Sequence, residues 1–181
     1  MNKTETIQGI SMVSIQSGSF LMGNDWKYDP SLPETVNIYY PDEQPVRKMA
    51  VKAFQLGKTP VTQEQYEKVM GTNPSFFTGD NSLPITNIGP FEIREFCNKL
   101  SVTAGFSPCY NEEMKTCDST KNGFRLPTEA EWEYACRAGT TTLFNTGNTE
   151  RDLDKAGWYL ANSGGKTHPV GQKAPNAWGL F

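Results

Sequence analysis

The sequence from residue 124 to residue 135 reads Phe124-Arg125-Leu126-Pro127-Thr128-Glu129-Ala130-Glu131-Trp132-Glu133-Tyr134-Ala135. Pro127 favours an extended backbone at the residue before it. Thr128 followed by Glu131 three positions later forms a capping box, which predicts a helix that begins at Thr128. The helix dipole favours the anions Glu129 and Glu131 in the first turn. This stretch therefore predicts an extended segment followed by a capped helix.

Each residue of this motif has a structural explanation. We expect Arg125 and Leu126 to end a strand, and Trp132 to pack the helix against the core together with Ala135 and Cys136. Gly139 suits the left-handed conformation that often ends a helix. The motif is therefore interpreted as structural and not catalytic, and its members are Arg125, Leu126, Pro127, Thr128, Glu129, Glu131 and Trp132.

Two more helices are predicted before this motif. Thr62 and Gln65 form a second capping box, and that helix should end at Gly71. Another helix should start near Pro90, which suits a first helical position. It shows one apolar face, made by Ile93, Phe96, Cys97 and Leu100.

Strands are expected nearer the N-terminus. Residues 12–15 and 19–22 flank Ser17-Gly18 and predict a hairpin with a tight turn. Residues 46–56 alternate and predict one half-buried strand, and residues 36–40 predict a short edge strand. From Gly139 onward the sequence contains turn clusters and no helical pattern.

Composition excludes some classes of function. The 181 residues have a net charge of −3 with acids and bases interspersed, so we expect no nucleic-acid partner. No apolar run reaches the ~18 residues that a transmembrane helix requires. No signal peptide is visible at the start of the chain. We therefore expect a soluble protein whose compartment the sequence leaves open.

Several stretches in order resemble the family of formylglycine-generating enzymes, also called sulfatase-modifying factors. The 124–135 motif is the most specific of them. The others are residues 18–23, 43–46 with Phe54, 59–66, 83–86 with 96–98, and 168–171 with 175–181. The resemblance implies an α+β, C-type-lectin-like fold of the formylglycine-generating-enzyme type. Such a fold is rich in loops, with a small twisted antiparallel sheet and a few helices.

The resemblance also implies where catalysis would reside. Members of the family oxidise a sulfatase cysteine to formylglycine with molecular oxygen, and they resemble copper enzymes whose metal is held by two C-terminal cysteines. None of the four cysteines here matches a catalytic position, and Phe181 lies just before the segment concerned. We expect residues 1–181 to be one C-terminally incomplete domain. Copper is expected as a cofactor only if the missing segment is present.

The four cysteines, Cys97, Cys109, Cys117 and Cys136, are interpreted as buried free thiols, the usual state of unpaired cysteine. By resemblance, Cys136 matches a cysteine that is disulfide-bonded in some family members, and Cys117 lies close to another. A copper(I) site at Cys109 and Cys117 is disfavoured by Glu112 and Glu113 between them.

Asn162 corresponds by resemblance to a calcium-ligand position, so calcium is a candidate cofactor. A calcium site needs about six to eight oxygen ligands. No acidic residue follows between positions 163 and 169, and the Asn162-Ser163-Gly164-Gly165 sequence also suits a plain turn.

Two functions follow from the sequence. In the first, the domain is non-catalytic and serves as a scaffold for a protein or peptide ligand, because loops can vary while the core persists. In the alternative, the chain is the incomplete form of a copper- and oxygen-dependent oxidase that converts a sulfatase cysteine to formylglycine.

Overall fold

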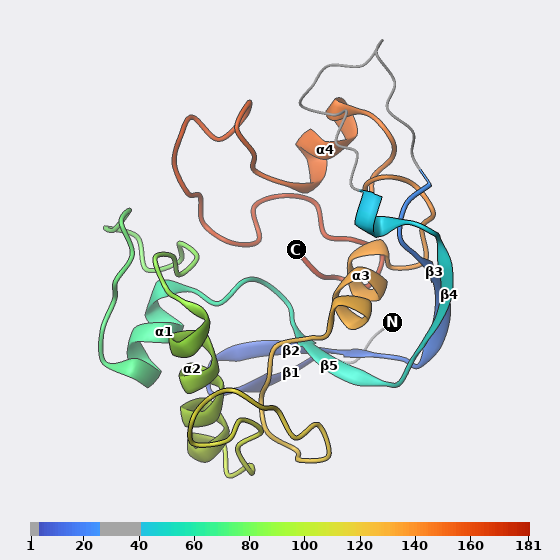
Figure 1. Ribbon diagram of the computed structural model, residues 1–181. Helices are drawn as coiled ribbons and strands as arrows, with labels where there is room; N and C mark the ends of the chain where they lie inside the picture. The colour runs from blue at the N-terminus through green and yellow to red at the C-terminus, as the bar shows by residue number, and fades with distance from the viewer. Residues whose placement is uncertain (1–3, 26–40) are drawn as a thin grey trace.

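Two small antiparallel sheets and four α-helices make up the described part of the computed structural model, residues 4–25 and 41–181 (Figure 1). The α+β prediction is confirmed. In chain order the elements are β1 (Thr4–Ile7), β2 (Ile10–Ile15), β3 (Gly18–Met22), the 3-10 helix η1 (Pro41–Glu43), β4 (Arg47–Val51), β5 (Phe54–Gly57), α1 (Gln63–Met70), α2 (Pro90–Thr103), α3 (Glu129–Arg137) and α4 (Glu150–Ala156).

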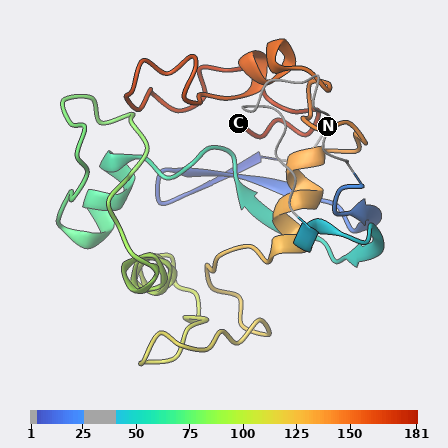
Figure 2. The same cartoon turned by 45° about the horizontal axis from the view of Figure 1, so that its top comes forward.

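The first sheet has the strand order β1-β2-β5, with β2 in the centre, and the second pairs β3 with β4. Gln8 and Gly9 join β1 to β2 with positive φ angles of 51° and 84°. A two-residue turn with two positive φ angles matches the natural twist of paired strands. Figure 2 shows the three-stranded sheet running from α1 and α2 on one side to α3 and the second sheet on the other.

Two strand predictions are wrong. Residues 12–15 and 19–22 form no hairpin, because β2 is already paired with β1 on one edge and β5 on the other, so β3 pairs with β4 instead. Residues 46–56 form two strands, because the chain leaves the second sheet after Val51 and joins the first at Phe54. The predicted edge strand over residues 36–40 lies outside the described residues.

The first two predicted helices are confirmed. The Thr62 side chain accepts a hydrogen bond from Gln65 N–H, and α1 ends at Gly71 with a left-handed φ of 78°. In α2 the predicted face buries Phe96, Cys97 and Leu100. The stacked rings of Tyr66 and Phe96, 5.3 Å apart between centroids, join the two helices.

The capped helix after Pro127 is also confirmed, but only Ala135 of the three residues predicted to face the core is buried. Trp132 is 58% exposed and Cys136 is exposed, whereas Ala135 is fully buried and Ala138 nearly so. Positions 131, 134, 135 and 138 form the inward stripe at helical spacing, and Trp132 lies on the next stripe. Tyr134 anchors the helix through ring contacts with Phe20 and Trp178. The prediction that Trp132 packs α3 onto the core is therefore wrong.

Two local details also differ from the predictions. Arg125 and Leu126 end no strand, because the flanking backbone donates to side chains: Phe124 N–H to the Ser101 hydroxyl at 2.7 Å, and Leu126 N–H to the Tyr110 hydroxyl at 3.0 Å. Sequence reasoning missed α4, which has a capping box of Thr149 with Asp152. The Thr-x-x-Asp spacing was the available signal for it.

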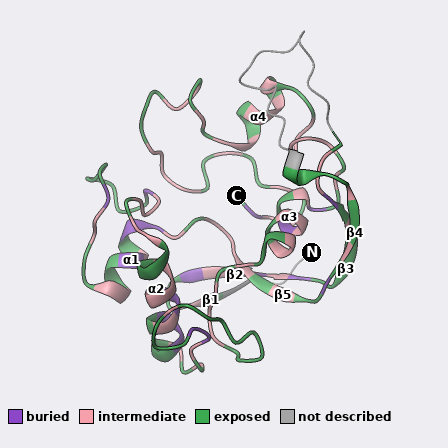
Figure 3. Ribbon diagram, in the orientation of Figure 1, coloured by how far each residue is buried: buried purple, intermediate pink, exposed green. Residues whose placement is uncertain are grey.

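The apolar side chains form two cores, which lie on opposite faces of β2. Figure 3 shows the buried residues along β2 and on the helices. Ile10 and Met12 belong to the core formed with α1 and α2. Val13 and Ile15 belong to the core that includes Ala135 and Leu180. Among the described residues, none of the helices is both long and apolar enough to span a bilayer.

The two cores and the exposed Trp132 predict contrasting stabilities. Leu100→Ala should lower the free energy of unfolding by about 2–5 kcal/mol, because Leu100 is only 2% exposed and its loss leaves a cavity. Trp132→Ala should lower it by less than about 1 kcal/mol, since Trp132 is largely exposed. Urea unfolding followed by circular dichroism measures both. A larger loss for Trp132→Ala than for Leu100→Ala would contradict the assigned faces.

Candidate functional site

A large open hollow is lined by residues of both cores, and we call it the central hollow. Its volume is about 2030 Å³. Its walls come from β5, the inner face of α2, the 119–127 loop, α3, the 139–148 loop and the C-terminal residues from Asn176 to Phe181. Pockets for small ligands are typically ~300–1,000 Å³. The central hollow therefore has room for a polypeptide segment.

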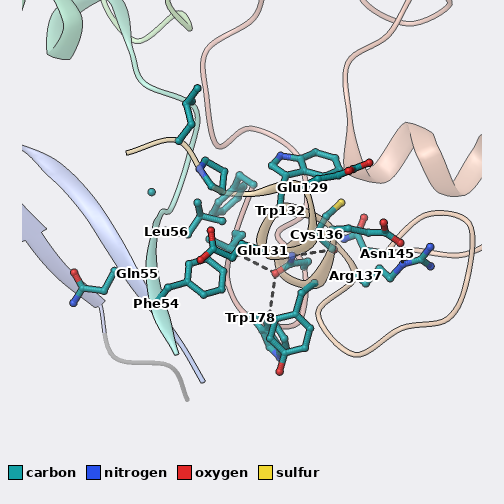
Figure 4. A pocket seen from close by; sticks show the side chains of 18 of the residues that line it. Phe54, Gln55, Leu56, Glu129, Glu131, Trp132, Cys136, Arg137, Asn145 and Trp178 are labelled. Atoms are coloured by element: carbon teal, nitrogen blue, oxygen red, sulfur yellow. Dashed lines mark hydrogen bonds and ion pairs between the residues drawn. The ribbon is translucent and has the colours of Figure 1, made fainter. Parts of the chain in front are cut away.

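Aromatic and aliphatic side chains line the walls on two sides (Figure 4). Phe54 and Leu56 of β5 lie on one side, and Trp132 and Cys136 of α3 lie on the other. Trp178 closes a further part of the wall and contacts Tyr134 edge to face, at 4.8 Å between ring centroids. The exposed surface of Trp132 therefore faces the hollow.

Asn176 holds the C-terminal wall in place. Its side-chain nitrogen donates to the carbonyl oxygens of Ala135, at 2.7 Å, and Cys136, at 3.2 Å, at the end of α3. Its side-chain oxygen accepts from the backbone N–H groups of Trp178 and Leu180. One amide therefore satisfies carbonyls at the helix end, which otherwise lack partners, and fixes the turn that presents Trp178.

Two ion pairs on the α3 side, Arg125 with Glu131 and Arg137 with Glu133, are formed within the protein. Arg125 binds Glu131 through two hydrogen bonds of 2.7 Å each, and Glu131 also accepts from Thr128 N–H at 2.8 Å. The hydrogen bonds from Arg125 hold the pKa of Glu131 below its ordinary value and raise the pKa of Arg125. Arg137 binds Glu133 at 2.8 Å, and both hydrogen-bond to the backbone of Gly23. These pairs fix the ends of β3 and α3 relative to each other.

The cysteines lie in two kinds of environment. Cys97 and Cys109 are buried, as predicted, whereas Cys117 and Cys136 are exposed, and all four are free thiols. Within residues 4–25 and 41–181, no group of three or more His, Cys, Asp or Glu side chains is arranged to hold a metal ion. The copper prediction concerned a further segment and stays a prediction.

Asn162 lies in a turn beside α4. Its side-chain oxygen accepts from Tyr159 N–H at 2.8 Å, and its nitrogen donates to Asp154 and to the Gly157 carbonyl. The Tyr159 hydroxyl donates to Asp154 and Glu150, and desolvation together with these carboxylates raises the pKa of Tyr159. These groups already hydrogen-bond to one another, and among the residues that the structure describes no three His, Cys, Asp or Glu side chains gather here as a metal site would require. The calcium site at Asn162 stays a prediction.

Sequence reasoning found part of this site. It singled out Trp132, but as a residue buried in the core. It quoted residues 175–181 only for their family resemblance. It did not single out Phe54, Leu56 or Asn176 as residues of one site. These residues are far apart in the sequence, and only the sheet pairing and the docking of α3 bring them together.

Comparisons with known proteins agree on one family. The family model described as "Sulfatase-modifying factor enzyme 1-like domain" matches residues 1–181. "Chaperone protein LppX" of Paenibacillus barcinonensis is 30% identical over 75% of this chain and 60% of its own length. "Formylglycine-generating enzyme" of Mycobacterium tuberculosis is 24% identical over 94% of this chain and 69% of its own length.

Solved structures agree with the fold. "Treponema denticola variable protein 1" has a TM-score of 0.82 and 31% identity, over 99% of this chain and 72% of that chain. PvdO from Pseudomonas aeruginosa has a TM-score of 0.72 and 23% identity, over 99% of this chain and 70% of that chain. The chain spans 60% of the length of LppX and 54% of the length of the Bos taurus formylglycine-generating enzyme.

The Arg125–Glu131 pair predicts a dependence of stability on pH. The folded-state pKa of Glu131 is lowered, so the stability contributed by its carboxylate is present above the unfolded pKa and is lost as pH falls through the folded pKa. Glu131→Gln should lower the free energy of unfolding at neutral pH by about 1.5–3 kcal/mol, as for hydrogen bonds to charged groups. Its stability should then fall less on acidification than that of the wild type.

Urea unfolding at a series of pH values measures this difference. Glu113→Gln is the control, because Glu113 pairs with Lys115 at an exposed site where an ion pair contributes ~0–1 kcal/mol. Parallel stability curves for the wild type and Glu131→Gln between neutral and acidic pH would show that the pair has no such role.

Proposed function

Since this chain belongs to the sulfatase-modifying factor enzyme 1-like domain family, we propose that it uses the family fold as a non-catalytic scaffold and binds a protein or peptide ligand in the central hollow. The observation that supports this most directly is the exposed Trp132 on the wall of a hollow of about 2030 Å³. Tryptophan is one of the residues most enriched among the energetic hot spots of protein interfaces.

The chemistry of the walls favours a polypeptide with an apolar anchor. Trp132 is exposed, and the half-buried Phe54 and Trp178 add aromatic surface to the wall. Covering exposed aromatic surface with an apolar side chain is favourable. Glu131 and Glu133 have their cationic partners within the protein. The ligand therefore needs no strong charge to complete an ion pair with these two carboxylates.

The names of the relatives are compatible with this proposal. LppX is called a chaperone protein, and a chaperone has a polypeptide as its partner. The Treponema denticola relative is called a variable protein. Surface loops can vary while the core of a fold persists, so a scaffold of this kind suits a binding function.

The binding proposal predicts that Trp132→Ala weakens capture of peptides. Immobilised protein would be used to select binders from a library of displayed random peptides, and the selected peptides would be measured by calorimetry. Loss of a hot-spot tryptophan should raise Kd at least about tenfold, because hot spots contribute ~2 kcal/mol or more. Because Trp132 is largely exposed, the substitution is expected to change stability little, so the loss would be specific to binding.

Phe76→Ala is the matched control. Phe76 is 83% exposed and does not line the central hollow, so its substitution should leave Kd unchanged. Equal losses for Phe76→Ala and Trp132→Ala, or no loss for Trp132→Ala, would argue against the hollow as the binding site.

The alternative function is the oxidase of the same family. Its support is the relative named formylglycine-generating enzyme, which matches 94% of this chain. We expect residues 1–181 to form no aldehyde from a cysteine-containing sulfatase-type peptide supplied with copper(I) and oxygen, because none of the four cysteines matches a catalytic position of the family. Mass spectrometry after hydrazine labelling detects the product. Multiple turnovers of aldehyde would overturn the non-catalytic proposal and favour the oxidase.

A further inference from the structure

A second, smaller pocket lies where the loop between α1 and α2 meets the loop that follows α4, and we call it the loop pocket. Its volume is about 590 Å³, within the range of ~300–1,000 Å³ that is usual for small-molecule sites. Val170 N–H donates to the Ser82 carbonyl at 3.0 Å and holds the two loops side by side (Figure 2). The loop pocket shares no lining residue with the central hollow, and it is lined by residues 74–77, Thr86, Asn87 and Thr167.

Two phenylalanine rings are open at the loop pocket. Phe76 is 83% exposed and Phe77 is 37% exposed. The rings contact each other edge to face, at 5.1 Å between centroids. Most of the Phe76 ring therefore remains uncovered. A further aromatic ring that packs against such a pair gains attraction beyond the burial of apolar area.

A buried amide fixes the loop that carries these rings. Gln63, at the start of α1, is only 1% exposed. Its side-chain nitrogen donates to the Phe77 carbonyl at 2.8 Å, and its side-chain oxygen accepts from the Asn73 side chain at 2.9 Å. The Ser75 hydroxyl accepts from Thr86 N–H at 3.1 Å. These contacts hold the backbone on both sides of the exposed ring, so the loop pocket is pre-formed.

One polar group at the loop pocket lacks a partner. Of the buried side-chain nitrogen and oxygen atoms in residues 4–25 and 41–181, Thr167 Oγ1 is the one without a hydrogen bond. Buried hydroxyl groups in proteins are nearly always paired, because an unpaired one costs free energy. The Asn87 side-chain nitrogen, by contrast, donates to the Pro74 carbonyl at 3.0 Å. Single exposed apolar side chains are common, but here the exposure coincides with a fixed loop and an unpaired hydroxyl.

We propose that the loop pocket binds a small phenol, whose ring covers Phe76 and whose hydroxyl forms a hydrogen bond with the Thr167 hydroxyl. A phenol hydroxyl both donates and accepts, so it complements either role of the threonine hydroxyl. A hydrocarbon ring would leave Thr167 unpaired, and an aliphatic alcohol would lack the contact between aromatic rings. The ligand is neutral, because the described residues that line the pocket include no charged side chain. Since the two pockets share no lining residue, the inference is independent of what the central hollow binds.

The test titrates isotope-labelled protein with phenol, benzene and cyclohexanol, and it follows the amide signals of Phe77 and Thr167 by NMR. These three probes have nearly the same size, and NMR measures the weak affinities that such small molecules have. Phenol should bind about two- to tenfold more tightly than either of the others, as expected for one net hydrogen bond or one aromatic pair. The indole signal of Trp132 reports separately on the central hollow.

Three variants identify the contacts. Thr167→Val removes the hydroxyl but nearly keeps the shape of the side chain, so it should reduce the affinity for phenol to that for benzene and leave the affinity for benzene unchanged. Its melting temperature should not fall, because no hydrogen bond is lost. Phe76→Ala should weaken the binding of both aromatic probes. Val102→Ala is the control, because Val102 is exposed on α2 and lines neither pocket.

Four outcomes would overturn the proposal. In the wild type, these are equal affinities for phenol and benzene, and saturable shifts that occur at Trp132 but not at Phe77 and Thr167. An unchanged affinity of Thr167→Val for phenol would remove the role of the hydroxyl. A lower melting temperature of Thr167→Val would show that this hydroxyl already has a partner within the protein.

Discussion

The rest of the structure depends on one strand that is buried on both faces. Alternate residues of β2 point to opposite sides, so Ile10 and Met12 enter one core while Val13 and Ile15 enter the other. A shift of β2 by one residue would exchange these two sets between the cores, which makes the register with β1 and β5 strongly specified. The two cores are therefore separate, and the central hollow is the space between the elements that flank them.

The docking of α3 follows from the second core. Ala135 has no exposed surface, and so small a side chain lets the helix backbone approach Val13 and Ile15 closely. Tyr134 then contacts Phe20 of one sheet and Trp178 of the C-terminal segment. Trp132 is three residues before Ala135 but belongs to the adjacent stripe, so close packing of the alanine face turns the tryptophan toward the hollow. Its exposure is a consequence of tight packing elsewhere on the same helix.

Local signals in the sequence predicted the helices well. The capping boxes at Thr62 and Thr128 involve residues three positions apart, and both are present in the structure. The strand pairs were predicted poorly, because β4, the partner of β3, is separated from it by residues 23–46 and the choice of partner depends on which strand edges are already paired. The prediction of the buried face of α3 failed for a related reason. Trp132 and Ala135 both suit a core, and only the elements that pack against the helix decide which of the two is buried.

Side chains hold the segment of residues 124–126 between the cores, where a sheet would use backbone hydrogen bonds between strands. Phe124 N–H and Leu126 N–H donate to the hydroxyls of Ser101 and Tyr110, and Arg125 binds Glu131 across the start of α3. Backbone groups that are satisfied in this way leave the segment extended without fixing it in a sheet. The wall of the hollow is consequently held by a few discrete contacts, and Tyr110 makes the one at Leu126 N–H. Through this hydrogen bond the start of the 110–116 loop is joined to the extended segment that precedes α3.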